Sequence, residues 1–505
     1  MVVPDDFEVL IVGAGFSAII CAIQLDALGI PWRIVERQED WGGTWCLNTY
    51  PEARVDITNF IYSFTFEPQY PWEHAFAPRE ELMAYVRYLV DKHGLGDRAH
   101  FRTQVVNARW QDDDARWEVT LEGPDGQTET RRPNVLLSCS GLFSTPRLPD
   151  IPGIESFAGE MFHTTNWNHD YDHHGKRVAL IGTGSTGSQL APRVAEEAAS
   201  LTIYQRTPNW VTPVGRYRAP IPEPRKWLLR HLPGYTQWNR YSHTHASIRI
   251  QALQHLDPQW QAEGGRVNEK NDLLRKGLTA MIRHKMKGRP ELIEHLIPDF
   301  APLSRRIVVD NGFYDTLLRD DVHLDVTGIE EIQPGGILGK DGVYREYDLI
   351  ILAAGFDVER YLHPVPYQGR DGKTLEDLWS KDGARAYLTM TLPHFPNFFM
   401  MYGPNAAVRA SSFHSAVEML SRYICETIVS MLEHGATSVT VKPEVHDAYN
   451  ERLDEGMKGM LWEQEKGGNS YYLNRHGKSG VNMPWEMYEF YDFIRAPAPA
   501  DFEYR

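Results

Sequence analysis

Two glycine-rich turns in this sequence contain the residue types that bind phosphate groups. Each follows an apolar run typical of a buried strand, at 7–12 or 177–181. The turns read Gly13-Ala-Gly15-Phe16-Ser17-Ala18 and Gly182-Thr183-Gly184-Ser185-Thr-Gly187. Glycines in a strand–turn–helix unit let the backbone approach a pyrophosphate, which then lies at the helix N-terminus. Each turn therefore predicts a dinucleotide site.

The residues that end the next strands distinguish the two predicted sites. The strand expected at 32–36 ends in Glu36, about 20 residues after the first turn, where a carboxylate binds ribose hydroxyls. The strand expected at 200–205 is followed by Arg206 and Thr207 instead. Because an arginine can pair with a 2′-phosphate, the second site is predicted to bind NADP. A turn that merely closes a βα unit is the alternative for the first motif alone, and Glu36 argues against it.

Length and composition exclude several classes of protein. The chain has 505 residues, enough for two to four domains, and its net charge of −16 argues against nucleic-acid binding. Its four cysteines form no Cys-x-x-Cys pair, which excludes a close-spaced dithiol centre and a cysteine zinc site: Cys21, Cys46, Cys139 and Cys425. No metal site is predicted. The start lacks the basic segment of a signal peptide, so a cytoplasmic protein without membrane insertion is expected.

The remaining pattern predicts an α/β fold with two Rossmann-like, dinucleotide-binding domains and a helical insertion. Buried strands are expected at 134–141 and 347–355, and helical spacing without strand-like alternation occupies 221–298. Within the insertion, the basic stretch 275–287 is interpreted as a core-packing helix with a charged outer face. The alternative of an amphipathic membrane-surface helix stays open.

The string Phe157-x-Gly159-x-x-x-His163-x-x-x-Trp167 precedes the second turn. It matches the fingerprint of the Baeyer–Villiger monooxygenases, class B flavoprotein monooxygenases, which nearly the whole chain resembles. Asn168 departs from the Pro or Asp usual at the next position. Supporting matches lie at 42–45, 53–56, 205–208 and 354–357, and the end of the chain resembles the 4-hydroxyacetophenone monooxygenase branch.

This resemblance implies an enzyme that uses FAD, NADPH and O₂. It would insert one oxygen atom next to a ketone carbonyl, through an anionic peroxide of the flavin, to give an ester or lactone. An aryl or bulky ketone is favoured, and the oligomeric state is not predicted. Two alternatives are a sulfide or amine monooxygenase and, of a different class, an NADPH–flavin reductase.

The motifs and the resemblance together imply a set of site residues. The catalytic arginine of the family matches Arg306, and its acidic partner matches Asp56. His163 and Trp167 are expected in an interdomain linker that couples the position of NADP to flavin reactivity. FAD contacts are expected at Gly13, Gly15, Phe16, Ser17, Glu36, Thr44, Trp45, Asp56, Tyr62 and Val105. NADP contacts are expected at Gly182, Thr183, Gly184, Ser185, Gly187, Arg206, Thr207, Arg305, Arg306 and Tyr471.

The expected domain order follows from these assignments. Both nucleotide domains should be discontinuous, with the helical insertion inside the NADP-binding domain. The predicted ranges are 1–145 and 386–505 for FAD, the latter including a C-terminal lid, 146–220 and 301–385 for NADP, and 221–300 for the insertion.

Overall fold

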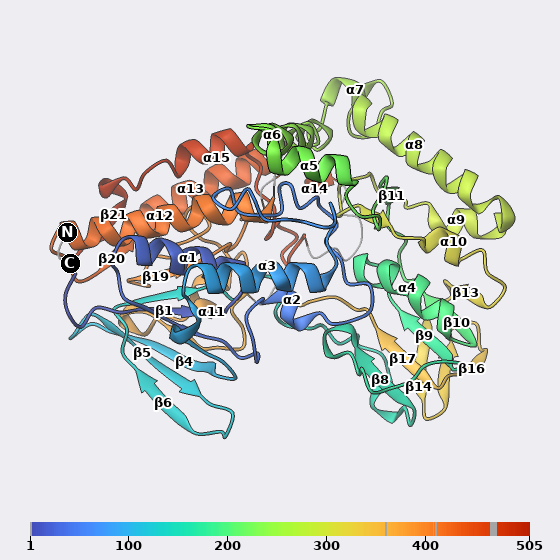
Figure 1. Ribbon diagram of the computed structural model, residues 1–505, viewed down its shortest axis with the longest axis horizontal. Coiled ribbons are helices and arrows are strands. Elements are labelled where there is room, and N and C mark those ends of the chain that lie inside the picture. Colours follow the sequence, from blue (N-terminus) through green and yellow to red (C-terminus); the bar gives the residue numbers. More distant parts are fainter. Residues whose placement is uncertain (1–2, 359–360, 408, 410–411, 465–471) are drawn as a thin grey trace.

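The computed structural model describes residues 3–358, 361–407, 409, 412–464 and 472–505. Two separate five-stranded parallel sheets form its framework (Figure 1). The predicted α/β fold with two Rossmann-like units is confirmed. None of the helices in the described part of the chain combines the length and apolarity needed to cross a membrane.

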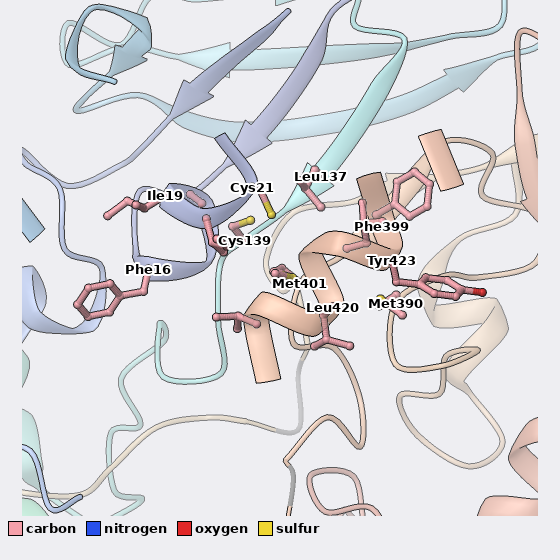
Figure 2. Packing of buried hydrophobic residues seen from close by; sticks show 14 of the residues in the cluster. Phe16, Ile19, Cys21, Leu137, Cys139, Met390, Phe399, Met401, Leu420 and Tyr423 are labelled. Atoms are coloured by element: carbon pink, nitrogen blue, oxygen red, sulfur yellow. The ribbon is translucent and has the colours of Figure 1, made fainter. Parts of the chain in front are cut away.

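The first sheet contains strands from both ends of the chain. Its order is β19 (Phe398–Met400), β7 (Val135–Ser138), β1 (Val9–Val12), β2 (Trp32–Val35) and β3 (Ala99–His100). On one face, α1 (Phe16–Ala27), α3 (Arg79–Lys92) and α12 (Phe413–Glu433) contribute to a shared apolar core. Figure 2 shows side chains of α1 and α12 meeting in this core, with the Cys21 and Cys139 side chains beside each other. The opposite face packs against an accessory sheet of β18 (Tyr367–Gln368), β4 (Gln104–Gln111), β5 (Arg116–Glu122) and β6 (Thr128–Arg131).

The second sheet lies within one continuous stretch of chain. Its order is β13 (Val322–Asp325), β10 (Ser200–Tyr204), β9 (Arg177–Ile181), β17 (Leu349–Leu352) and β8 (Glu160–His163). One face packs against α4 (Ser185–Glu197) and α10 (Phe313–Thr316). The other packs against β14 (Ile329–Gln333) and β15 (Gly336–Gly339), which pair with β16 (Tyr344–Glu346).

The two chain connections between the sheets run side by side. Arg147 N donates to Gly355 O and Asp357 N donates to Thr145 O, each at 2.9 Å. These connections follow β7 and β17, interior strands next to the central strand of each sheet. The carboxyl ends of both parallel sheets therefore face a common region, which is where ligands bind in such folds.

Helices fill the predicted insertion. They lie between β11 (Val211–Pro213) and β12 (Val308–Asp310), which pair with each other, so the insertion starts and ends at adjacent strands. The helices are α5 (Glu223–His231), α6 (Tyr235–Ile248), α7 (Pro258–Ala262), α8 (Glu269–Lys285) and α9 (Ile293–Leu296).

The packing of α8 decides between the two interpretations of the basic stretch 275–287. Leu278 and Ile282 are buried in the core of the second unit, beneath the outward-facing Arg283 and His284. The stretch is therefore a core-packing helix with a charged outer face.

Candidate active site

A cavity of about 1770 Å³ lies where both sheets end. Both glycine-rich turns line it, together with the segment that carries Asp56 and the segment that carries Arg306. Pockets for a single drug-sized ligand have volumes of roughly 300–1,000 Å³, so this cavity has room for more than one ligand.

The first glycine-rich turn packs closely against the core of the first unit. Gly13 has φ of +105°, and a Cβ there would lie 2.7 Å from the carbonyl oxygen of Cys139. Only glycine fits such a position, because its left-handed backbone and close approach both exclude a side chain. Beyond it, Gly15, Phe16 and Ser17 bring the N-terminus of α1 to the cavity wall. This places unpaired helical N–H groups and the positive end of a helix dipole at the cavity.

Glu36, at the end of β2, joins this turn through its carboxylate. Oε2 accepts a hydrogen bond from Ala14 N at 2.7 Å, and Oε1 accepts one from Gln38 N at 2.8 Å. The side chain is buried but lines the cavity. The strand end and the turn therefore hold each other in position and present an acceptor to a ligand.

Thr44, Trp45, Tyr62 and Val105 form a second part of the same wall. Thr44 and Trp45 begin α2 (Thr44–Leu47), and Trp45 Nε1 donates to the Tyr62 hydroxyl at 3.1 Å. Burial raises the pKa of Tyr62 to about 12. The phenol therefore stays neutral, and the pair forms a rigid aromatic surface.

The second turn repeats the construction of the first. Gly182 has φ of +113°, and a Cβ there would lie 2.5 Å from the carbonyl oxygen of Ala353. A Cβ on Gly187 would lie 2.1 Å from Gly182 O, so this third glycine is needed for helix α4 to pack against the turn. Gly184 has open space on its Cβ side, and with Thr183 and Ser185 it lines the cavity.

Two arginines lie beyond the second turn. Arg206 is exposed at the cavity wall next to Thr207, and Arg305 lies half-buried with its guanidinium 4.6 Å from the centre of the Phe300 ring. Burial lowers the pKa of Arg305, and the positive charge of Arg206 lowers it further. Two cations this close favour an anion between them, which suits a phosphate group.

Arg306 and Asp56 meet across the cavity although 250 residues separate them. Arg306 Nη2 donates to Asp56 Oδ1 at 2.5 Å. The Asp56 side chain is 17% exposed and that of Arg306 is 49% exposed, so the arginine is the more open of the two at the cavity wall. The structure thus brings together the two residues expected to carry the chemistry.

Known proteins resemble this chain over its whole length. A family model described as FMO-like, flavin-binding monooxygenase-like, matches residues 7–218. An uncharacterized monooxygenase, y4iD, of Sinorhizobium fredii is 35% identical over 97% of this chain and 74% of its own. A Baeyer–Villiger monooxygenase of Streptomyces coelicolor is 31% identical over 99% of this chain and 94% of its own. The chain belongs to the Baeyer–Villiger monooxygenase family.

Solved structures agree with this membership of the Baeyer–Villiger family. OTEMO in complex with FAD and NADP superposes with a TM-score of 0.86 at 28% identity, covering all of both chains. The specific likeness to the 4-hydroxyacetophenone branch stays a prediction.

The fingerprint residues of this Baeyer–Villiger monooxygenase lie in the second unit. His163 ends β8, where it pairs with Leu352 of β17, and its Nδ1 accepts a hydrogen bond from Thr165 N at 3.2 Å. Burial lowers the pKa of His163. Trp167 packs on Phe162 with ring centres 4.8 Å apart. Neither His163 nor Trp167 is among the described residues that line the cavity, so any coupling role would be indirect and stays a prediction. Tyr471 lies outside the described residues.

Sequence reasoning missed a buried polar contact between the two units. The Tyr50 hydroxyl donates to Gln189 Oε1 at 3.0 Å, and Gln189 Nε2 donates to the Tyr217 hydroxyl at 3.0 Å and to Arg54 O at 2.9 Å. Gln189 belongs to α4, directly after the second turn, and Arg54 lies two residues before Asp56. The glutamine therefore ties the second nucleotide turn to the segment that carries Asp56. Its only sequence signal is its position two residues after Gly187.

The insertion and the segment before α12 supply a third wall that was also missed. Arg409 is buried at the cavity and donates to Gln254 Oε1 at 3.1 Å, Gln251 O at 2.7 Å and Pro484 O at 2.6 Å. Burial lowers the pKa of Arg409 to about 10. Apolar and aromatic side chains also line the cavity: Ile250, Leu253, Leu303, Tyr402, Phe413 and Trp462.

Proposed function

We propose that this enzyme binds FAD at the first turn and NADPH at the second, and that it oxygenates a ketone to an ester or lactone beside Arg306. The observation that carries this proposal is the Arg306–Asp56 contact of 2.5 Å inside a cavity lined by both turns. Membership of the Baeyer–Villiger family supports the reaction class.

The residues present fit both cofactors. At the first turn, close-packed glycines, a helix N-terminus and the Glu36 carboxylate match the needs of a pyrophosphate and a ribose. At the second, Arg206 and Arg305 provide the positive charge that a 2′-phosphate requires. When bound, the flavin reduced by the nicotinamide activates O₂ and supplies the oxygen atom.

The protein's own contribution is a fixed cation in a confined space. Arg306 keeps its proton at any physiological pH, so it stabilises negative charge that develops on the oxygen atoms of the reacting groups. Asp56 accepts a hydrogen bond from one guanidinium nitrogen of Arg306, which fixes the direction of the group at the cavity. The Gln189 contact, in turn, holds the Asp56 segment against the second nucleotide turn.

The apolar side chains that line the cavity support a finer proposal on the substrate. Leu253 of the insertion, with Phe413 and Trp462 of the C-terminal part, favours burial of an aryl or bulky aliphatic group. All four cysteines are free, with three of them buried, which is consistent with the proposed cytoplasmic location.

The domain division also stays a proposal. Strand pairing supports residues 160–352 as the framework of the NADP-binding unit. Because β18 (Tyr367–Gln368) pairs with β4, we place the return to the FAD-binding unit before residue 367 rather than at 386.

The proposed function is tested with Arg306→Ala. Removing a preorganised donor to a developing oxyanion costs about 10²–10³ in rate, so conversion of ketone to ester should fall by that factor. Reduction of bound flavin by NADPH, measured anaerobically, should persist. Arg495→Ala is the matched control, because Arg495 is exposed and is not among the described residues that line the cavity. Ester formation by Arg306→Ala at the rate of the control would disprove the catalytic assignment.

The FMO-like family model over residues 7–218 favours one second candidate, a sulfide or amine monooxygenase. This activity has less need of a cation beside the oxygen donor. A sulfide oxidised faster than any ketone, with no loss in Arg306→Ala, would support it. NADPH oxidation that yields only hydrogen peroxide with every substrate would indicate a reductase.

A further inference from the structure

Helices α5 and α6 turn aromatic side chains outward. Trp227 is 59% exposed, Trp238 62% and Tyr241 67%. On α6, Trp238, Tyr241 and Ile248 recur at helical spacing, so they share one stripe of the helix. We call this surface the α5–α6 outer face, defined by Trp227, Leu232, Trp238, Tyr241 and Ile248.

The inward side of the same helices is mostly polar, with Leu229 of α5 as an apolar side chain that packs against the core of the first unit. Lys226 is buried and donates to Glu73 and Glu223 at 2.5 and 2.8 Å. Asn239 is also buried and accepts from Arg225 at 2.7 Å, while Arg240 donates to Ser63 O at 2.9 Å. A water-facing helix of a globular protein has the opposite arrangement, with apolar residues inside. The inverted arrangement indicates that the outer face meets an apolar environment.

The charge around this face differs from that of the whole chain. The chain carries a net charge of −16, yet residues 223–250 contain five basic residues and Glu223 as their single acidic residue. Three of the five, Arg225, Lys226 and Arg240, make the inward contacts described above. The other two, Arg230 and Arg249, are exposed on the same segment as the outer face. Tryptophan and tyrosine rings combined with arginine match the boundary between lipid acyl chains and anionic headgroups.

The outer face leads toward the cavity. Ile250 directly follows Arg249, is 41% exposed, and also lines the cavity. Leu253 and Gln254, one turn later, line the cavity as well. A surface held against the α5–α6 outer face would therefore lie next to the apolar wall of the proposed substrate site.

We propose that the α5–α6 outer face docks this enzyme on the surface of a membrane that contains anionic lipids. The aromatic side chains enter the headgroup region, and Arg230 and Arg249 contact lipid phosphates. Docking of this kind is peripheral, without a membrane-spanning helix, and it stands independently of the function proposed above.

The test is co-sedimentation of the holoenzyme with vesicles of phosphatidylcholine, with or without phosphatidylglycerol. The wild type should bind the anionic vesicles, and binding should weaken as salt is added. The triple variant W227S/W238S/Y241S should lose about tenfold or more in affinity. Y488S/Y491S removes two exposed aromatic residues of α15 (Met487–Phe493) beside acidic neighbours, and as the matched control it should bind like the wild type.

A second variant keeps the proposal testable if the triple variant does not fold. R230Q/R249Q should weaken binding to anionic vesicles by about fivefold for each charge removed. Failure of the wild type to bind either vesicle, or equal binding by all variants, would overturn the proposal. So would a wild-type dimer in sedimentation analysis that the triple variant converts to a monomer, because the face would then pair two copies of the chain. NADPH oxidation in the absence of vesicles should be the same for all variants.

Discussion

The two glycine-rich turns share one backbone construction but have different surroundings. In each, the first glycine has positive φ and lies against the carbonyl of the residue that follows an interior strand, Cys139 after β7 or Ala353 after β17. The first turn is bound to the buried Glu36 carboxylate, whereas the second lies beside the exposed Arg206. The third position is Ala18 in the first turn and Gly187 in the second.

This difference shows how the same turn construction, used twice in one chain, can suit two different ligands. The first turn is built into the core, so its geometry depends on the packing of the whole unit. The second turn keeps an open side at Gly184, and we expect it to recognise its ligand by the charge of Arg206 and Arg305. A resident cofactor suits the first arrangement, and a cofactor that arrives and leaves suits the second.

Among the variants that test this comparison, Gly13→Ala should lose the most stability. The new Cβ would lie 2.7 Å from a backbone oxygen at a residue with φ of +105°. Strain and overpacking together should cost about 3 kcal/mol or more, with loss of bound FAD. Thermal unfolding and flavin content measure this. Gly184→Ala is the matched control, since its Cβ meets open space, and it should fold normally. Equal stability of the two variants would mean that close packing at Gly13 does not exclude a side chain.

Arg206→Ala should act on the second turn alone. Loss of a charged hydrogen-bond donor costs about 1.5–3 kcal/mol, so KM for NADPH should rise roughly tenfold or more while KM for NADH stays unchanged. Steady-state kinetics with both nucleotides measure the ratio. Arg193→Ala, on α4 but paired with Glu196 and Glu197, is the control. An unchanged preference for NADPH would remove Arg206 from the phosphate site.

Ala18→Gly and Gly187→Ala test whether glycine is required at the third position of the motif in each turn. Ala18 is fully buried in α1 and is tolerated there, so a glycine would gain nothing and would cost about 0.5–1 kcal/mol in backbone entropy. Gly187→Ala, by contrast, would create a 2.1 Å approach to Gly182 O. Denaturant unfolding of both variants should show a small loss for the first and a much larger loss for the second.

The smallest effect concerns pH. His414, the second residue of α12, packs on Phe16 of the first unit with ring centres 4.4 Å apart, and burial lowers its pKa well below the usual value. Burial also lowers the pKa of His163 in the second unit. Each ring holds a proton less readily in the folded than in the unfolded protein, so the free energy of unfolding should fall as pH drops below about 6.5, the ordinary pKa of histidine. His414→Phe should flatten this slope more than His163→Phe, as measured by unfolding at a series of pH values.

The sequence alone was sufficient to predict those parts of the site that depend on short local patterns. Gly13 and Gly182 sit in strand–turn–helix units whose spacing already implies a phosphate site, and Glu36 and Arg206 end the next strands. The Arg306–Asp56 contact could be expected only from family resemblance, because no local pattern links residues 250 positions apart. Gln189 and Arg409 were missed for the same reason, since each acts through partners brought near by tertiary folding.

The α5–α6 outer face shows a second feature that the sequence alone could not predict. Helical periodicity identified the insertion but could not tell which stripe of each helix faces the protein. Trp238 and Tyr241 would normally be assigned to the inside and Arg240 to the outside, and the structure has the reverse.

The discontinuous first sheet has a consequence for how the chain is made. The ribosome releases every strand of the second sheet by residue 352, whereas the first sheet lacks β19 until residue 400 and α1 lacks its partner α12 until residue 433. Because domains generally fold as units during synthesis, the second unit can assemble while the apolar side of α1 is still uncovered. The unit that begins at the N-terminus is therefore the one whose sheet and helix packing can be completed last.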